Sequence, residues 1–292
     1  MDGICVFLNG DRGIPVVQRL RDAGHAFCGI FVPPGKGRAL AAALATDAVT
    51  EVGNVNDPGF CARLAALGPR LGLVAGFSSI FRQTLIDIPA LGTINLHGGR
   101  LPEYRGGSPL NWQIIRGEPR VGISVIRLDQ GIDTGEVLAD AEIPLGPADT
   151  IAEVHERANG IFPRLVLDVV ERFARGNTAG VTQDSVRAAY WHQRSDADGH
   201  VDWRGLSSQE VHNLVRAVTR PYPGAFAFVG EALVRIYRTE VPATAIRGVP
   251  GRVCYIQGVG PYVVCRDQAI LVRDYQFEGE SNARLRHGDH LA

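Results

Sequence analysis

Short apolar runs alternate with helix-like segments through the first half of the chain, and this rhythm limits the fold more than any other feature. The runs with the length of buried strands are residues 3–8, 27–32, 71–76 and 91–96. The segments between them that we expect to be helical are residues 14–23, 38–46 and 57–67. Strands and helices in this order form a parallel sheet with helices on both faces. We therefore predict an α/β fold with a mostly parallel sheet.

The second half of the chain has a different character. Two further strand-like runs, residues 121–128 and 137–145, precede a long amphipathic helix over residues 151–175. Residues 192–202 are polar and rich in turn formers, and residues 207–218 combine a serine cap with one apolar side. The short β-rich runs that follow are residues 225–229, 233–237, 252–255, 262–265 and 269–272. These runs predict a small β-barrel or sandwich.

These patterns and the charge balance bound the organisation of the protein. We expect an α/β catalytic domain over residues 1–185, a linker over 186–203, and a smaller β-rich, OB-like domain with one helix over 204–292. Hydrophobic residues make up 45% and charged residues 21% of the chain, as in an ordinary globular protein. The net charge of −1 offers no basic excess to neutralise a nucleic-acid backbone, which disfavours a tRNA partner. A local basic patch is still compatible with a net charge close to zero.

The cysteines and the N-terminus point to an intracellular protein. The five cysteines are scattered and form no CxxC pair, so we expect reduced core thiols and no metal site. Residues 3–8 begin almost at the start of the chain, without the basic segment and cleavage site of a signal peptide. No apolar stretch approaches the roughly 20 residues of a membrane span. We expect a cytoplasmic protein that makes no membrane contact.

Polar side chains gather at the end of the apolar run at residues 91–96. Asn95 and His97 are two residues apart, so in a strand both side chains face one pocket. A loop rich in Gly and Pro follows them, and the glycines around Asp133 permit a tight turn that could return a carboxylate to the same pocket. Ligands of parallel sheets bind at the carboxyl ends of the strands.

An asparagine, a histidine and a carboxylate at one site suit acyl transfer to an amine. A neutral imidazole can take the proton of the attacking amine near pH 7. The amide N–H of Asn95 can stabilise negative charge on the acyl oxygen, and Asp133 can orient the imidazole. No serine or cysteine nucleophile is evident, so we expect direct transfer. These features alone do not separate a catalytic histidine from a structural one at the end of a strand.

Three motifs in order resemble the folate-dependent formyltransferase family. They are Asn95-x-His97, the LPxYRG stretch over Leu101–Gly106, and Asp133-Thr134-Gly135. The likeness extends over nearly the whole chain. The segments most similar to sugar N-formyltransferases, such as the domain acting on UDP-4-amino-4-deoxy-L-arabinose, are Asn54–Asn56, Pro109–Trp112, Asn213–Val218 and Pro221–Phe226. The resemblance implies a Rossmann-like N-terminal domain, a smaller β-rich C-terminal domain, and N10-formyltetrahydrofolate as formyl donor.

The resemblance also implies roles for individual residues. Asn95 would contact the formyl oxygen, His97 would be the general base, and Asp133 would complete the triad. The residues expected to contact the folate are Phe77, Ile80, Phe81, Gly98, Gly99, Arg100, Leu101, Pro102, Asp129 and Ile132. The residues expected to contact the acceptor are Tyr104, Arg105, Trp112, Asn213, Arg216 and Tyr222.

The sequence departs from the family pattern directly after His97. Many members have HxSLLP there, whereas this chain has Gly99 in place of the serine and Arg100 in place of the first leucine. Arg100 could meet the glutamate tail of the folate or an acceptor phosphate, or it could be merely solvated. Arg105 could bind a diphosphate or tie its loop down, and Trp112 could stack on a ligand or pack in the core.

We predict transfer of a formyl group to the amine of a nucleotide-linked amino sugar, by an enzyme that could form a homodimer. Initiator methionyl-tRNA and a small amine or peptide precursor stay open as acceptors. Hydrolysis of the formylfolate and a non-catalytic folate- or nucleotide-binding regulator are further alternatives. An NAD enzyme is a weaker one, because Gly10 and Gly13 do not complete a GxGxxG fingerprint.

Overall fold

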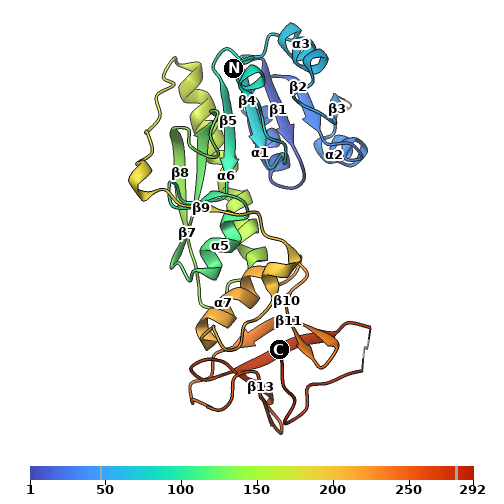
Figure 1. The fold of residues 1–292 in the computed structure, drawn as a ribbon. Helices are drawn as coiled ribbons and strands as arrows, with labels where there is room; N and C mark the ends of the chain where they lie inside the picture. Colours follow the sequence, from blue (N-terminus) through green and yellow to red (C-terminus); the bar gives the residue numbers. More distant parts are fainter. Residues whose placement is uncertain (47, 280–281) are drawn as a thin grey trace. The chain divides into compact units, whose positions relative to one another are not determined.

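The computed structural model describes residues 1–46, 48–279 and 282–292, which form two compact units (Figure 1). The first unit comprises residues 1–109, 122–143 and 156–191. The second comprises residues 110–121, 144–155 and 192–292.

A seven-stranded sheet dominates the first unit. Its strands, in spatial order, are β3 (Val49–Glu51), β2 (Phe27–Val32), β1 (Ile4–Leu8), β4 (Leu71–Ala75), β5 (Thr93–His97), β7 (Arg120–Arg127) and β8 (Val137–Pro144). The helices that accompany it along the chain are α1 (Gly13–Asp22), α2 (Gly37–Leu44), α3 (Pro58–Ala66), α4 (Gln83–Ile86), α5 (Pro109–Ile115) and α6 (Ile151–Ala174). The first five strands are parallel, and β7 runs antiparallel to β5. The predicted fold, a mostly parallel α/β sheet, is confirmed.

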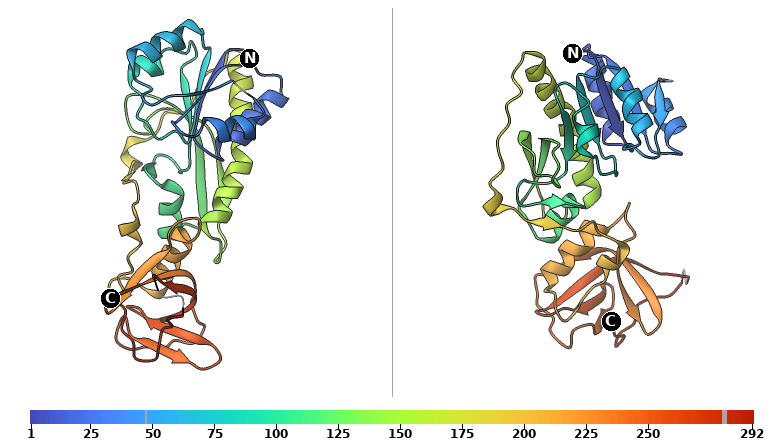
Figure 2. Two further views of the ribbon diagram at one scale, coloured as in Figure 1. Left: turned by 90° about the vertical axis from the view of Figure 1, so that its right-hand side faces the viewer. Right: turned by 45° about the horizontal axis from the view of Figure 1, so that its top comes forward.

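Helices cover both faces of this sheet because its central strands are apolar on both sides. All five residues of β1 are buried. Cys5 and Phe7 pack in one cluster with Phe60 of α3. On the other face, a side chain at Gly13 would meet Leu8 Cβ at 2.7 Å, so the close approach of α1 to β1 requires this glycine. Figure 2 shows α3 on one side of the sheet and α1 with α6 on the other.

The strand order reverses between β1 and β4, which is the switch point of this type of sheet. The chain runs from β1 outward through β2 and β3, and then returns to β4 and β5 on the opposite side of β1. Ligands of open α/β sheets bind beyond the carboxyl ends of the strands at such a point. The loop after β4 and the polar end of β5 lie at this edge.

The C-terminal part of the second unit is a five-stranded antiparallel sheet. Its strands, in spatial order, are β10 (Ala225–Val229), β11 (Ala232–Glu240), β14 (Ala269–Phe277), β13 (Gly260–Val264) and β12 (Val253–Ile256). The C-terminal tail links the two edges, since Leu291 bridges to Val229 and His290 bridges to Arg252. The expected β-rich, barrel-like domain is therefore confirmed. Helix α7 (Ser208–Val218) precedes this sheet, with Ser207 and Glu210 forming its capping box.

Three short strands, β3, β6 (Arg105–Gly106) and β9 (Tyr190–Trp191), were not predicted. β6 pairs in parallel with β9. Two 3-10 helices, Ser185–Arg187 and Asp196–Gly199, flank β9 in the chain. The pairing ties residues up to Trp191 to the first unit, so the compact units do not follow the expected boundaries at 185 and 203. Periodicity could not reveal a two-residue strand, because such a strand carries no repeat. Among the described residues, no helix has the length and apolarity needed to cross a bilayer.

Candidate active site

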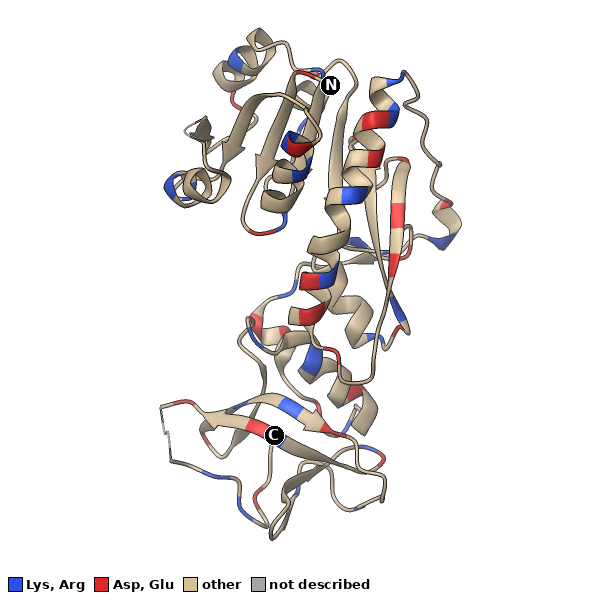
Figure 3. Cartoon of the chain, turned by 180° about the vertical axis from the view of Figure 1, so that it is seen from behind, with Lys and Arg blue, Asp and Glu red and all other residues tan. Residues whose placement is uncertain are grey.

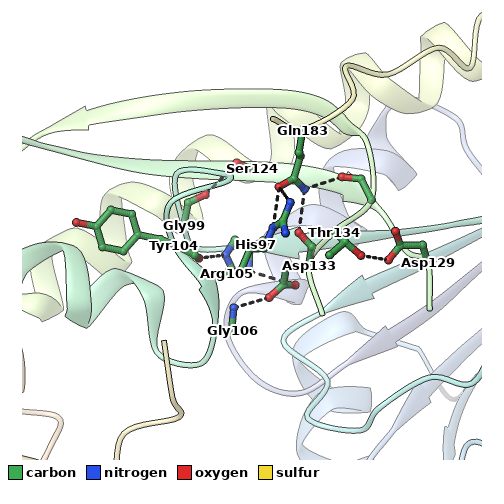
Figure 4. Close-up of polar contacts among 11 residues, drawn as sticks. His97, Gly99, Tyr104, Arg105, Gly106, Ser124, Asp129, Asp133, Thr134 and Gln183 are labelled. Carbon is green, nitrogen blue, oxygen red and sulfur yellow. Dashed lines mark hydrogen bonds and ion pairs between the residues drawn. The ribbon is translucent and has the colours of Figure 1, made fainter. Parts of the chain in front are cut away.

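His97 is the last residue of β5, and its ring is held at both nitrogens. The side chain is 5% exposed. Nε2 lies 2.6 Å from the backbone oxygen of Tyr104, and Nδ1 lies 3.5 Å from Oδ1 of Asp133. Figure 4 shows the Tyr104 carbonyl facing the imidazole while the phenol ring points away from it. The carbonyl can only accept, so Nε2 carries the hydrogen and Nδ1 faces the carboxylate.

Asp133 reaches the site from a tight turn, as the sequence predicted. Its φ of +53° is left-handed, a conformation that Asp tolerates better than most residues. Oδ2 accepts a hydrogen bond from the backbone N–H of Gly106 at 2.8 Å. Asp129 closes the same turn, since its Oδ1 accepts from Thr134 Oγ1 at 2.6 Å and from Gly131 N at 3.0 Å. The carboxylate of Asp133 is thus fixed by backbone geometry on both sides.

Gln183 anchors this turn and was not predicted as a site residue. Its amide nitrogen donates to the backbone oxygens of Asp133 and Gly135 at 2.8 and 2.7 Å. Its amide oxygen accepts from Nε and a terminal nitrogen of Arg105 at 3.0 and 2.9 Å (Figure 4). No local sequence signal marks this glutamine, because its partners lie 50 and 78 positions away in the chain.

The side chain of Arg105 holds Gln183 in place through these hydrogen bonds. It is 5% exposed, and besides Gln183 it donates to the hydroxyl of Tyr190 at 3.0 Å. Of the two predicted roles, binding a diphosphate or tying the loop down, these contacts match the second. Arg105 and Tyr104 lie next to the candidate catalytic residues, and direct contact of either with an acceptor stays a prediction.

Asn95 lies two residues before His97 in β5 and is partly exposed. The two side chains share one face of the strand, as expected. The register places Asn95 beside Val74 of β4 and Ile126 of β7. Asn95, His97 and Asp133 all belong to the first unit. The structure therefore brings the three predicted catalytic residues to one edge of one sheet.

The residues expected to contact a folate fall into two groups. Phe77 is 9% exposed and packs with Phe81 in the apolar cluster beneath the sheet edge. Ile80 and Ile132, in contrast, are 82% and 60% exposed, at the loop after β4 and in the Asp133 turn. Single exposed apolar side chains are common on protein surfaces, so exposure alone assigns no role to these two residues. These two isoleucines are available to the flat rings of a ligand at this edge.

The loop after His97 is tightly packed. Ser124 Oγ donates to the backbone oxygen of Gly99 at 2.9 Å. A Cβ placed on Gly122 would meet Arg100 Cβ at 2.4 Å and Arg100 Cα at 2.7 Å, so only glycine fits below this loop. The Arg100 guanidinium lies 5.6 Å from the centre of the Tyr104 ring. Arg100 and Leu101 also line a cavity of about 340 Å³ beside β7 and β8. Gly98 and Pro102 complete the loop and are buried.

The remaining predicted acceptor residues belong to the second unit. Asn213 and Arg216 are 5% and 7% exposed, and they bond each other at 3.0 and 3.2 Å. Arg216 also donates to the backbone oxygens of Gly146 and Asp149, so this pair fastens α7 to the loop before α6. Their direct contact with an acceptor stays a prediction, and so does that of Trp112 and Tyr222. Trp112 Nε1 donates to the His192 carbonyl at 3.0 Å, and Tyr222 bonds His155 at 3.1 Å.

This arrangement can carry out direct acyl transfer. A buried imidazole beside a fixed carboxylate can receive a proton, and a nearby amide can stabilise charge on an acyl oxygen. The sheet edge and its exposed isoleucines can hold a flat ligand. The fold and the site together therefore define an acyltransferase of the Rossmann-like class.

Comparison with known proteins identifies the family. The formyl transferase model matches residues 37–170, and the model of the formyl transferase C-terminal domain matches residues 194–287. A methionyl-tRNA formyltransferase of Ruminiclostridium cellulolyticum is 30% identical over 286 residues, covering 94% of this chain and 91% of that protein. The chain therefore belongs to the formyl transferase family, and the expected formyltransferase is confirmed.

Two solved structures share the fold at lower identity. A sugar 3N-formyl transferase, WlaRD, crystallised in the presence of dTDP and 5-N-formyl-THF, has a TM-score of 0.70 at 15% identity, covering 96% of this chain and 99% of that one. HypX from Aquifex aeolicus in complex with tetrahydrofolic acid has a TM-score of 0.66 at 20% identity, covering 94% of this chain. The chain spans 44% of the HypX structure.

These comparisons correct the predicted acceptor. Relatives of about 30% identity over both domains carry the name methionyl-tRNA formyltransferase, whereas the sugar enzyme is 15% identical and shows the shared fold alone. The prediction of a nucleotide-linked amino sugar is therefore wrong, and so is the inference that neutral charge disfavours a nucleic acid. The short segments that resemble sugar N-formyltransferases all lie within the residues matched by the two formyl transferase models.

Proposed function

We propose that the protein transfers the formyl group of N10-formyltetrahydrofolate to the amino group of methionyl-tRNA. The observation that carries this proposal is the match to methionyl-tRNA formyltransferases over both domains, with 94% of this chain and 91% of the relative aligned. A relative that shared only the sheet and its catalytic edge would support the chemistry but not the acceptor. The match to the C-terminal domain model extends this likeness to residues 194–287, which lie outside the catalytic sheet and are available to recognise the tRNA.

The site residues have direct roles in this reaction. The methionyl nitrogen forms a bond to the formyl carbon, and the bond from that carbon to N10 of the folate breaks. The amide of Asn95 stabilises the charge that develops on the formyl oxygen. His97 takes the proton that the amine loses, with Asp133 beside it, and the leaving N10 gains a proton. Ile80 and Ile132 offer apolar contacts to the rings of the folate.

The distribution of arginines in the second unit supports a polyanionic acceptor. Acidic and basic residues are interspersed along α6 (Figure 3), but three arginines, Arg220, Arg273 and Arg284, line one pocket of about 300 Å³ beside β14. Asp274 lines the same pocket and pairs with Arg220, and Glu240 pairs with Arg273, so an acceptor phosphate would have to compete with these carboxylates. Planar guanidinium groups grip phosphates with paired hydrogen bonds. A neutral total is therefore compatible with a local phosphate site.

A formylation assay with defined acceptors tests the proposal. The purified protein is incubated with N10-formyltetrahydrofolate and charged initiator methionyl-tRNA, and the methionine released from the tRNA is analysed by mass spectrometry. We expect formylmethionine with the wild type and a formylation rate about 10²–10⁴-fold lower with His97→Asn. Uncharged tRNA and free methionine serve as controls. Formylation of a free amine or an amino sugar in preference to methionyl-tRNA would overturn the proposed acceptor, and formate release without any acceptor would overturn transfer itself.

A further inference from the structure

Gly99 lies directly against the imidazole of His97. A Cβ built on Gly99 would be 2.5 Å from His97 Nε2 and 2.6 Å from the Tyr104 backbone oxygen. Both distances are far shorter than real contacts of a Cβ atom, so any side chain at position 99 would force one of these groups to move. One of them is backbone, and the other belongs to a ring that is 5% exposed. The observed position of His97 therefore requires glycine at residue 99.

The loop cannot retreat to make room for a side chain. The backbone oxygen of Gly99 accepts a hydrogen bond from Ser124 Oγ at 2.9 Å. The next residue, Arg100, is packed against Gly122 so closely that even a methyl group there would lie 2.4 Å from Arg100 Cβ. The loop is thus held against β7. The imidazole, not the loop, would have to move.

What Gly99 permits is the hydrogen bond from Nε2 to the Tyr104 carbonyl. At 2.6 Å this bond is short, and the carbonyl cannot donate, so Nε2 must carry the hydrogen. Turning the ring over would place a carbon atom against the carbonyl instead, which excludes the flipped orientation. Nδ1 then faces Oδ1 of Asp133 at 3.5 Å.

We propose that Gly99 is a positioning residue that holds the His97 ring with Nε2–H on the Tyr104 carbonyl and Nδ1 toward Asp133. The consequence of this role for turnover rests on the proposed function. A carboxylate only accepts hydrogen bonds, so Asp133 stabilises this ring orientation when Nδ1 carries a proton as well.

A serine at position 99 would collide with His97 Nε2 and with the Tyr104 carbonyl in the same way as alanine, because both residues carry a Cβ atom. Both substitutions are therefore expected to displace the imidazole.

The tautomer of His97 can be measured without any turnover. Long-range proton–nitrogen correlation spectra of the full-length protein labelled with [15N]histidine distinguish Nε2–H from Nδ1–H, and His97→Asn identifies the His97 signals. We expect Nε2–H in the wild type. An Nδ1–H tautomer would overturn the proposal, even if the protein formylates methionyl-tRNA. The wild type could show the expected tautomer and still fail to formylate methionyl-tRNA. That result would support the positioning role of Gly99 and overturn only the proposed function.

Kinetics of Gly99→Ala and Gly99→Ser test the consequence for the reaction. Displacement of a catalytic group by about 1 Å can cost roughly 100-fold, so we expect kcat to fall about 10- to 100-fold in both variants. KM for the folate should change little, and the acid limb of the pH profile should move with the altered tautomer signals. Gly160→Ala is the matched control, because a Cβ there meets nothing within 4 Å. Folded Gly99 variants with wild-type kcat and pH profile would overturn the proposal. If neither variant folds, the tautomer of His97 in the wild type tests the proposal by itself.

Discussion

The backbone N–H of Gly106 donates to Oδ2 of Asp133 across 2.8 Å, joining the loop after His97 to the turn that carries the carboxylate. The donor has a φ of +94°, and a Cβ there would lie 2.3 Å from the Trp191 carbonyl. One glycine therefore connects the catalytic turn with the pairing of β6 and β9. The orientation of the carboxylate depends on contacts that lie far apart in the chain.

Replacing His97 by asparagine should abolish most of the activity. Loss of a general base typically costs 10²–10⁴-fold, and we expect kcat for formylation to fall within about that range. Because asparagine occupies a similar volume, the fold should survive, which circular dichroism can check. A rate close to that of the wild type in a folded His97→Asn variant would remove His97 from the reaction.

Gln183→Glu should separate positioning of Asp133 from chemistry. The carboxylate of the variant keeps an acceptor for Arg105 but replaces the amide that donates to the Asp133 and Gly135 carbonyls. Two lost donors should let the turn shift, and we expect kcat to fall about 10- to 100-fold with little change in KM for the folate. Stopped-flow or quenched single turnovers separate the two parameters. An unchanged kcat would mean that the turn holds its shape without Gln183.

Gly106→Ala should destabilise the protein and reduce activity together. The added methyl group must displace the Trp191 carbonyl, which breaks the β6–β9 pair and moves the donor of Asp133. Gly288→Ala is the control, since Gly288 has a similar φ of +89° but a Cβ there meets nothing within 4 Å. The excess loss of unfolding free energy in Gly106→Ala over Gly288→Ala, from denaturant titrations, measures the collision alone. Equal losses in the two variants would show that backbone strain, not the collision, is the cause.

The arginines beside β14 should contribute to tRNA binding through phosphates. Arg273→Gln and Arg284→Gln should each weaken binding and lower the slope of log K against log salt by about 1 if each guanidinium contacts one phosphate. Arg247→Gln is the control, because Arg247 is exposed in the same unit but does not line that pocket. Filter binding at several salt concentrations gives the slopes. Identical slopes for all three variants would place the phosphate contacts elsewhere.

His212 should make the second unit less stable in acid. Burial is the main cause that lowers the pKa of His212 below its usual value of 6.5, and its nitrogens bond Thr239 and Pro147 at 3.0 and 2.8 Å. The unfolded chain therefore binds the proton more readily, so the contribution of His212 to stability is complete above about pH 6.5 and is lost as the pH falls.

The matched variant for this histidine is His212→Gln, which removes the titration. Loss of two hydrogen bonds should lower the free energy of unfolding by about 1–3 kcal/mol at pH 7.5. The deficit relative to the wild type should shrink at pH 5, because the wild type then bears the cost of the buried charge. Urea titrations at both pH values measure it, and a deficit that grows in acid would contradict the assigned direction of the pKa.

The sequence by itself determined the layered sheet and singled out the candidate catalytic residues. Buried strands such as β1 and β4 are marked by short runs of apolar residues, and helix starts by local caps such as Asp57, because both depend on neighbours along the chain. The Asn95-x-His97 spacing places both side chains on one face for the same reason. Asn95 and His97 share a face wherever this segment forms a strand, whatever packs around it.

Only the tertiary structure decided how the site is held and what its nitrogens do. Gln183, the β6–β9 pair and the contact of Gly99 with His97 depend on residues brought together from distant parts of the chain or on packing against a loop. The net charge likewise misled the choice of acceptor, since a sum over 292 residues carries no information on where three arginines lie. Short-range patterns fix elements, whereas tautomers, anchors and surface charge follow from distances that only folding sets.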